Sequence, residues 1–307
     1  MDLGLLDFVK NELCPNGIWT LSDAMRSVLD RQMLRLPRSN VSEMDTRYPT
    51  SPAGMRAFLE VFFTRHYFQG QDSLVEYMVS QDFLDAIGSG NLRILDVGSG
   101  PALASLAIAD MLSSIVGYLM DSHLWQWGQV AVTYVLNDTS GVCLGTGQQM
   151  LRNYFNLARS RGGAIIQGPT FDVQRPFPDS MSQLRRIAHN LGLYDIATFS
   201  YVVVPLSENK GLNEAVNGLM ATENICSNSA RILVLQDRFN TSLMQAIGGK
   251  LGTSKREREL SQEVYPDRNT TGTYTYSYYS CLYAPSEKRM GRHSFVAQMS
   301  PDLAVAF

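Results

Sequence analysis

The sequence has little of what defines disulfide-bonded, zinc-binding and several hydrolytic proteins. Its 307 residues include four cysteines, spread along the chain without a Cys-x-x-Cys pair. This spacing indicates reduced, packed thiols and no disulfide framework or zinc site. The four histidines show no metal-ligand spacing, so we expect each of them, His66 included, to be structural or exposed, and we predict no metal. A Gly-x-Ser-x-Gly elbow and a phosphate-binding Gly-Lys-Ser/Thr loop are also missing.

Charge of one sign and long apolar runs are equally scarce. The formal net charge is −3, which predicts no general attraction to nucleic acid. The apolar stretch 107–120 is interrupted by Asp110 and two serines, so it falls short of the roughly 18 residues that indicate a membrane span. The first residues lack the basic segment of a signal peptide. We therefore expect a cytoplasmic protein without a membrane anchor.

The most informative segment is residues 92–107. An apolar strand runs into Asp96, a Gly-x-Gly turn at Gly98 and Gly100, and an amphipathic helix with Pro101 expected at its first position. The glycines let the backbone turn tightly and approach a ligand, and the helix start presents free N–H donors. A nucleotide-like cofactor is predicted at this turn.

The spacing of the turn indicates which cofactor binds. A dinucleotide site needs a third glycine, and Leu103 stands at that position. The pattern Asp-x-Gly-x-Gly-x-Ala, from Asp96 to Ala102, instead resembles the first motif of the class I S-adenosylmethionine (SAM) methyltransferases, in which glycine is commonest at the last position. The resemblance implies that the Asp96 carboxylate approaches the methionine end of SAM, directly or through water. The turn residues that it places at the cofactor are Gly98, Ser99, Gly100 and Ala102.

Two regions are predicted, a helical one (residues 1–90) and a SAM-binding one (residues 91–307). In the first, Ser22 and Ser51-Pro52 signal helix starts, and a further helix is expected from Val75 to about Gly88. This helical cap covers a substrate pocket, pairs two copies of the chain, or simply packs on the sheet, and the sequence leaves these three open.

From residue 91 strands and helices alternate, which predicts a parallel sheet with helices on both faces. The strands are expected at residues 93–97, 130–136, 164–167, 195–201 and 231–235. Two closing strands, 273–283 and 294–299, match the antiparallel strand pair that ends the methyltransferase sheet. The predicted fold is α/β, a seven-stranded, mostly parallel Rossmann-like sheet with an antiparallel C-terminal strand pair, preceded by an N-terminal helical cap.

The resemblance also implies an acidic residue that holds the ribose hydroxyls at the end of the second strand. That residue is Asp138 if the strand is 130–136, and Thr139-Ser140 then caps the next helix. Asp121 has the more usual spacing from the glycine turn and takes this place if the strand is 115–120. We prefer Asp138, because 115–120 is short.

Two further segments complete the predicted site. Residues 171–178 look like the family's adenine-contacting turn, with Asp172 as the acceptor for the adenine amino group; the alternative is a surface Asp in a proline-rich loop. The fourth strand ends at Ser200-Tyr201, where the family lines both cofactor and acceptor. We expect Ser200 near the methyl donor through its backbone and Tyr201 against the acceptor, although a tyrosine in an apolar strand also packs in a core.

The predicted function is methyl transfer from SAM to an N, O or C nucleophile on an unidentified small molecule, protein or RNA. The alternative is a non-catalytic methyltransferase-like binding protein. A nicotinamide oxidoreductase is disfavoured by Leu103 and by the two closing strands.

Overall fold

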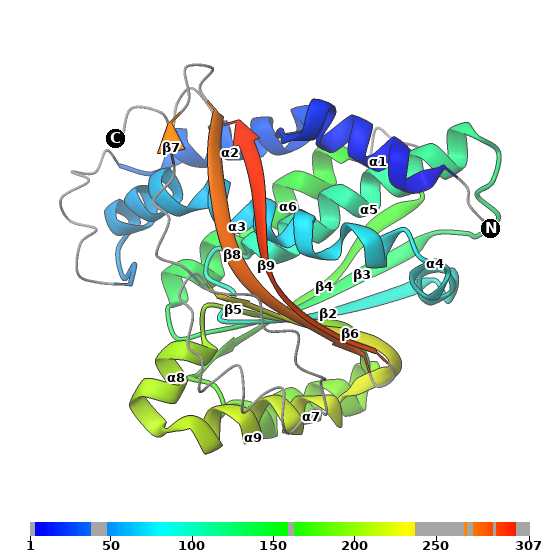
Figure 1. Cartoon of the computed structure of the whole chain (residues 1–307). Coiled ribbons are helices and arrows are strands. Elements are labelled where there is room, and N and C mark those ends of the chain that lie inside the picture. The colour runs from blue at the N-terminus through cyan, green and yellow to red at the C-terminus, as the bar shows by residue number, and fades with distance from the viewer. Residues whose placement is uncertain are drawn as a thin grey trace.

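One mixed sheet with helices on both faces organises the protein (Figure 1). The computed structural model describes residues 4–37, 48–158, 163–236, 267–268, 273–284 and 287–298. The strands are β1 (Ile18–Trp19), β2 (Asn91–Val97), β3 (Val130–Asp138), β4 (Ile165–Gln174), β5 (Tyr194–Ser200), β6 (Cys226–Gln236), β7 (Asp267–Arg268), β8 (Thr273–Ala284) and β9 (Glu287–Gln298). The α-helices are α1 (Leu5–Leu13), α2 (Asp23–Arg35), α3 (Pro52–Met78), α4 (Gln81–Gly88), α5 (Leu103–Asp121), α6 (Gly141–Ala158), α7 (Met181–Leu191), α8 (Val203–Lys210) and α9 (Leu212–Glu223).

The centre of the sheet is parallel, as the alternation of strands and helices predicts. The order along the sheet is β1-β9-β8-β6-β5-β2-β3-β4, with β7 beside β8. β2 pairs in parallel with β3 and β5, β3 with β4, and β5 with β6. The chain builds outward from β2 to β4 and then returns to β5, so the order reverses between β2 and β5. In doubly wound sheets this reversal is the topological switch point.

The far side of the sheet is extended by the C-terminal strands. β8 runs antiparallel to both β6 and β9, and β9 carries the short parallel strand β1 on its outer side. Among the described residues the sheet has nine strands instead of the predicted seven, because two strands of two residues, β1 and β7, join it. β9 begins at Glu287, well before the predicted residue 294, since Gly291 pairs with Ser280 instead of turning. Strand pairing overrides the local turn signal there.

The helix starts follow the capping signals, but some predicted boundaries are wrong. Ser22 Oγ accepts from the Met25 N–H (3.2 Å) and Ser51 Oγ from the Gly54 N–H (3.1 Å). α3 continues from Pro52 to Met78, and Ser80 then caps α4, so the helix predicted from Val75 is two elements. The helix after the glycine turn begins at Leu103 and not at Pro101. α8 is not predicted.

The helices form two apolar cores, one on each face of the sheet. α1 to α6 lie on one face and α7 to α9 on the other, as Figure 1 shows for all but α4, which sits beside the sheet. α5 is enclosed between the sheet and α3, and it is the one helix of the described residues long and apolar enough to cross a membrane; 83% of its apolar window is buried inside the protein. The N-terminal helices share this core with α5 and α6.

A buried carboxylate ties the N-terminal helices to the sheet-covering ones. Asp110 of α5 accepts hydrogen bonds from Ser22 Oγ (2.7 Å), Tyr67 Oη of α3 (2.7 Å) and Tyr154 Oη of α6 (2.8 Å). Three hydroxyl donors compensate the carboxylate for its lost hydration. Helices from both predicted regions therefore meet at one polar centre.

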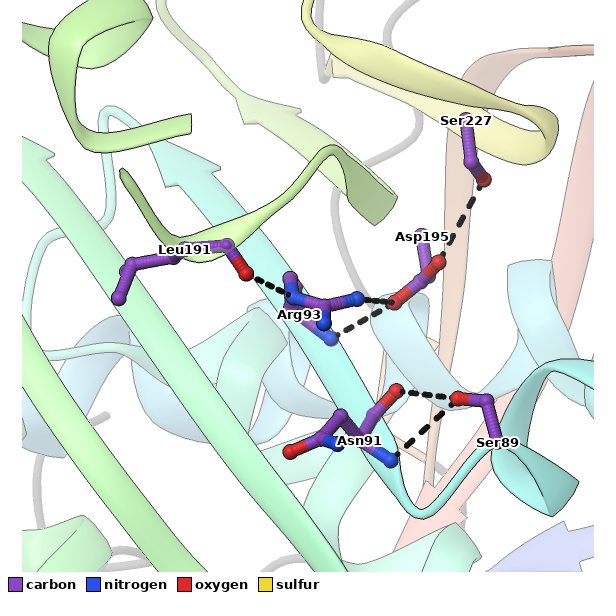
Figure 2. A network of polar contacts seen from close by, with 6 residues as sticks. All are labelled: Ser89, Asn91, Arg93, Leu191, Asp195 and Ser227. Carbon is purple, nitrogen blue, oxygen red and sulfur yellow. Dashed lines mark hydrogen bonds and ion pairs between the residues drawn. The ribbon is translucent and has the colours of Figure 1, made fainter. Parts of the chain in front are cut away.

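Polar side chains also brace the edge of the sheet where β2 and β5 begin (Figure 2). Asp195 accepts from the Arg93 N–H (2.9 Å) and Ser227 Oγ (3.4 Å), and its carboxylate lies 3.9 Å from the Arg93 guanidinium. Arg93 Nε donates to the Leu191 carbonyl (2.7 Å). We call this side of the sheet the amino edge; the opposite side, where β2, β3 and β5 end, is the carboxyl edge.

Candidate active site

The carboxyl edge at the switch point gathers most of the residues predicted to bind the cofactor. The glycine turn follows β2, Asp138 ends β3, and Ser200-Tyr201 closes β5. β2 is the direct neighbour of both β3 and β5, so these three chain segments leave the sheet side by side. Ligands of open α/β sheets bind in the crevice outside the strand ends at such a point.

The two glycines of the turn face different surroundings. Both have left-handed backbones, with φ of 66° at Gly98 and 53° at Gly100. A Cβ on Gly98 would lie 3.0 Å from the Ser200 carbonyl oxygen and 3.0 Å from Val202 Cβ, so Gly98 allows the turn to pack against the segment after β5. Above Gly100, the one described atom within 4 Å of an added Cβ is the Tyr48 hydroxyl, at 3.6 Å. Gly100 is therefore the glycine that leaves room for a ligand.

The Asp138 carboxylate lies directly beside that turn. It is 5% exposed and accepts from the Gly100 N–H (2.9 Å), the Ser140 N–H (2.8 Å) and the Tyr48 hydroxyl (2.6 Å). Residues 130–138 form the second parallel strand, whereas Asp121 is the exposed last residue of α5. The strand prediction that favours Asp138 is thus confirmed, and Ser140 caps α6 as expected by accepting from the Cys143 N–H (3.2 Å).

Asp96 takes an internal position instead of the ligand-facing one that the resemblance implies. It is 0% exposed; Ser105 Oγ and Thr198 Oγ1 each donate to it at 2.7 Å, and the Ser105 N–H donates at 3.3 Å. Burial raises the pKa of Asp96 to about 6, although these hydrogen bonds oppose the shift. The carboxylate therefore joins α5 to β5 beneath the turn.

Ser99 and Ala102, the other two predicted cofactor-binding residues of the turn, are buried. The N–H groups of Gly98 and Ser99 donate to the Asn137 carbonyl (2.8 and 3.1 Å), and Ser99 is 4% exposed. Ala102 has φ of 61°, which explains why glycine is common at this position of the motif. A Cβ on Gly147 of α6 would lie 2.8 Å from the Ala102 methyl group, so the absent side chain of Gly147 makes room for that methyl.

Asp172 lies away from the glycine turn. The predicted turn at residues 171–178 is wrong as far as Gln174, because β4 continues to that residue. Asp172 is exposed, pairs in register with Leu136, and has Gln148 of α6 as a side-chain partner. Opposite Asp138 at the strand end stands Gln174. A register shift beside Gly168 lets β4 continue where the sequence indicates a turn.

The end of β5 is strained. Tyr201 has φ of 60°, and its N–H donates to the Leu235 carbonyl (3.1 Å). A left-handed backbone costs a bulky residue about 1–2 kcal/mol. The Tyr201 ring stacks on His66 of α3, with centroids 3.9 Å apart and an interplanar angle of 22°. Tyr201 is therefore packed against the N-terminal helices, on the side where the acceptor is expected.

Two residues of the site, Tyr48 and His66, were not predicted from the sequence. Tyr48 is 44% exposed and reaches Asp138 from the segment before α3. His66 continues a row of half-buried aromatic rings on α3, after Phe58 and Phe62. The four-residue spacing of that row was visible, but it is equally typical of a helix that packs in a core. Burial, and to a lesser degree Arg65, lower the pKa of His66, so its imidazole is neutral.

The geometry at Gly100 and Asp138 fits a nucleoside. A sugar hydroxyl donates to a carboxylate as the Tyr48 hydroxyl does here, and the space above Gly100 admits a ligand that approaches the backbone. Tyr48 must leave for a nucleoside to bind, and its side chain is 44% exposed. The residues at the switch point therefore suit a ligand that contains a nucleoside.

Comparisons with known proteins add solved structures of low similarity. No protein-family model and no curated protein matches the chain. A precorrin-6y C5,15-methyltransferase from Geobacter metallireducens is 12% identical, with a TM-score of 0.31, covering 71% of this chain and 88% of its own. A SAM-dependent methyltransferase from Clostridium acetobutylicum is 10% identical, with a TM-score of 0.33 and 81% of each chain covered. A sugar N-methyltransferase from a Streptoalloteichus species is 10% identical, with a TM-score of 0.32, covering 85% and 84%. At such TM-scores we base the function on the site itself.

Proposed function

We propose that this protein is a SAM-dependent methyltransferase that transfers a methyl group to an N, O or C nucleophile of a small molecule, protein or RNA. The observation that carries the proposal is the 2.9 Å contact between the Gly100 N–H and the nearly buried Asp138 carboxylate, beside the open face of Gly100 at the switch point. A carboxylate held there supports recognition of ribose hydroxyls. The internal Asp96 and the left-handed Ala102 shape the turn that presents Gly100.

The residues of the chain contribute binding and positioning. SAM supplies a methyl group that is already activated on a sulfonium, so a metal or a covalent enzyme intermediate is not required. Asp138 holds the nucleoside, Gly100 allows its close approach to the backbone, and Gly98 lets the turn pack against the segment after β5. The aromatic rings of α3 and Tyr201 exclude water above the strand ends. Positioning and desolvation of this kind supply much of the rate of a group transfer.

A non-catalytic binding protein remains the second candidate. The Tyr48 hydroxyl takes a lone pair of Asp138 that a nucleoside needs (2.6 Å), which favours a protein that has lost its cofactor. Incubation with methyl-labelled SAM and a cell extract separates the two candidates. The enzyme labels an acceptor in proportion to protein concentration, and a binding protein does not.

Calorimetry with S-adenosylhomocysteine (SAH) tests the cofactor site directly. A hydrogen bond to a carboxylate contributes roughly 1.5–3 kcal/mol, so Asp138→Ala is expected to weaken SAH binding about 10- to 150-fold. Asp121→Ala, which removes an exposed carboxylate from the end of α5, is the matched control and retains wild-type affinity. The reverse ranking, or tighter binding of NAD than of SAH, contradicts the proposal.

We also propose that the enzyme works in the cytoplasm. Among the described side chains, Cys14, Cys143 and Cys226 form no disulfide. Free thiols of this kind are stable in a reducing compartment. Oxidation of these cysteines in protein purified from its native source under alkylating conditions would contradict this location.

A further inference from the structure

A row of aromatic rings on α3 faces the end of β5. Phe58, Phe62 and His66, called here the aromatic face, are four residues apart and half-buried. Their ring centroids are 5.1 Å apart from Phe58 to Phe62 and 5.3 Å from Phe62 to His66. Tyr201 closes the row at 3.9 Å from His66. Because Tyr201 directly follows the strand that flanks the glycine turn, the aromatic face lies where a methyl acceptor must come.

The ring planes in this row are suited to flat molecules. The interplanar angle is 28° between Phe62 and His66 and 22° between His66 and Tyr201, so both contacts are stacked. Offset-stacked rings gain about 0.5–1.5 kcal/mol beyond their buried area, and a saturated ring of similar size does not. These contacts join rings of the protein to one another, and we expect a planar acceptor to extend the same stack.

Two buried polar atoms beside Tyr201 have no hydrogen-bond partner among the residues that the structure describes. They are His66 Nε2 and Ser200 Oγ. Leaving a buried polar atom unpaired costs about 1–3 kcal/mol, and native proteins rarely accept this without a use for the atom. A neutral imidazole that carries its proton on Nδ1 offers a lone pair at Nε2. A donor group on a ligand would satisfy that lone pair.

We infer that the aromatic face and Tyr201 bind a planar aromatic methyl acceptor, and that His66 Nε2 accepts the hydrogen bond of its reacting O–H or N–H group. This inference rests on the proposed function. In the transfer, the sulfonium S–CH₃ bond breaks and its electron pair stays on sulfur, which becomes a thioether. The new bond joins the methyl carbon to the acceptor O or N. The acceptor proton moves to His66 Nε2, and the imidazolium releases it to water that enters once the methylated product has left.

Three bicyclic probes of similar size test the inference by calorimetry on the full chain saturated with SAH. 2-Naphthol is planar and carries an O–H donor, 2-methoxynaphthalene is planar without a donor, and 2-decalol has a donor on a saturated frame. We expect 2-naphthol to bind roughly 3- to 10-fold more tightly than 2-methoxynaphthalene, the gain of one hydrogen bond. 2-Decalol is expected to bind more weakly than 2-naphthol.

His66→Phe keeps the stacked ring and removes Nε2. It is expected to abolish the preference for 2-naphthol over 2-methoxynaphthalene, while the affinities for 2-methoxynaphthalene and SAH stay unchanged. His189→Phe, on the exposed surface of α7, is the matched control and keeps the preference. Should His66→Phe not fold, the comparison of the three probes on the wild-type protein still decides the matter.

Several results would overturn the inference. They are failure of 2-naphthol to bind the wild-type protein, equal affinity for 2-naphthol and 2-decalol, and an undiminished preference in His66→Phe. Wild-type SAH binding in the same samples shows that the proposed function survives such a result. Absence of SAH binding in the wild-type protein overturns the proposed function as well, which separates the two failures.

Discussion

The loops at the two edges of the parallel sheet differ in which residues adopt left-handed backbones. At the amino edge, the left-handed positions that lead into β2, β4 and β5 are glycines, Gly90, Gly163 and Gly192, with φ of 80°, 68° and 100°, whereas the segment before β3 contains the left-handed His123, with φ of 56°. At the carboxyl edge, Ala102 and Tyr201 adopt left-handed backbones with φ of 61° and 60°. Glycine accepts such angles without strain, and alanine or tyrosine does not.

The polar groups at the two edges can be compared by whether they have hydrogen-bond partners. The amino-edge carboxylate, Asp195, is held by Arg93 and Ser227 (Figure 2). At the carboxyl edge, His66 Nε2 and Ser200 Oγ have no hydrogen-bond partner among the described residues, and beside the amino edge the same holds for Tyr77 Oη, whose ring faces the Arg231 guanidinium. Strain and unsatisfied polar groups gather at functional sites, where a ligand or the mechanism uses them. The strained Tyr201 and the two unpaired atoms beside it therefore agree with a ligand site at the carboxyl edge.

The largest expected effect at the carboxyl edge is the pH dependence of stability that the buried Asp96 produces. Its pKa of about 6 lies above the ordinary value of 3.8, so between these pH values the folded protein holds a proton that the unfolded chain has released. Stability from this group is therefore fully present below about pH 4 and is lost as the pH rises through 6, by about 3 kcal/mol. We expect the unfolding free energy of Asp96→Asn relative to wild type to rise by that amount between pH 4 and 7. A pH-independent difference in urea unfolding would contradict this account.

Asp195 tests the amino edge, where a substitution is expected to lower stability without changing SAH binding. Asp195→Ala leaves the Arg93 N–H without its acceptor and removes the carboxylate 3.9 Å from the Arg93 guanidinium, and we expect a stability loss of about 2 kcal/mol in urea unfolding. SAH affinity should not change, because this edge lies at the other end of β2 and β5. Asp195→Asn retains an acceptor and is expected to lose about half as much. A large fall in SAH affinity of the folded variant would break the division between the edges.

Much of the fold follows from the sequence because its signals are local. The caps at Ser22 and Ser51 and the alternation after residue 91 place most helices and the five parallel strands. The errors arise where tertiary pairing overrides a local signal. β4 runs through Gly168 and Pro169 because β3 offers a partner along that length, and the unpredicted α8 begins with Val203 and carries Pro205 in its first turn.

The site residues also divide into those with a local sequence signal and those placed by tertiary contacts. The glycine turn and the end of β3 could be predicted, since both lie next to a recognisable strand. The choice between Asp138 and Asp121 needed the strand pairing, which spacing along the chain does not contain. Tyr48 and His66 come from a region whose contact with the strand ends is entirely tertiary. The internal position of Asp96 depends on Thr198, more than a hundred residues away.

Tyr48 offers a further test of the carboxyl edge, because its hydroxyl occupies a lone pair of the Asp138 carboxylate. Its hydroxyl donates to Asp138 at 2.6 Å. Tyr48→Phe removes this competitor, and we expect SAH to bind roughly 2- to 10-fold more tightly by calorimetry. Tyr194→Phe, which removes a hydroxyl that donates to the Leu184 carbonyl on the other face of the sheet, is the control without effect. Weaker SAH binding in Tyr48→Phe would mean that the phenol holds the ligand instead of competing with it.

The smallest expected effect comes from Ala102. The same substitution, alanine to glycine, is expected to raise stability at Ala102 and to lower it at Ala109. At φ of 61° the methyl group of Ala102 costs about 1–2 kcal/mol, which Ala102→Gly removes. Glycine loses about 0.5–1 kcal/mol more backbone entropy on folding, so we expect a net gain of up to about 1 kcal/mol in unfolding free energy. Ala109→Gly, in the middle of the following helix α5, gains nothing from strain relief and should lose about 1 kcal/mol. If both variants are destabilised equally in urea, the left-handed turn at Ala102 is not strained.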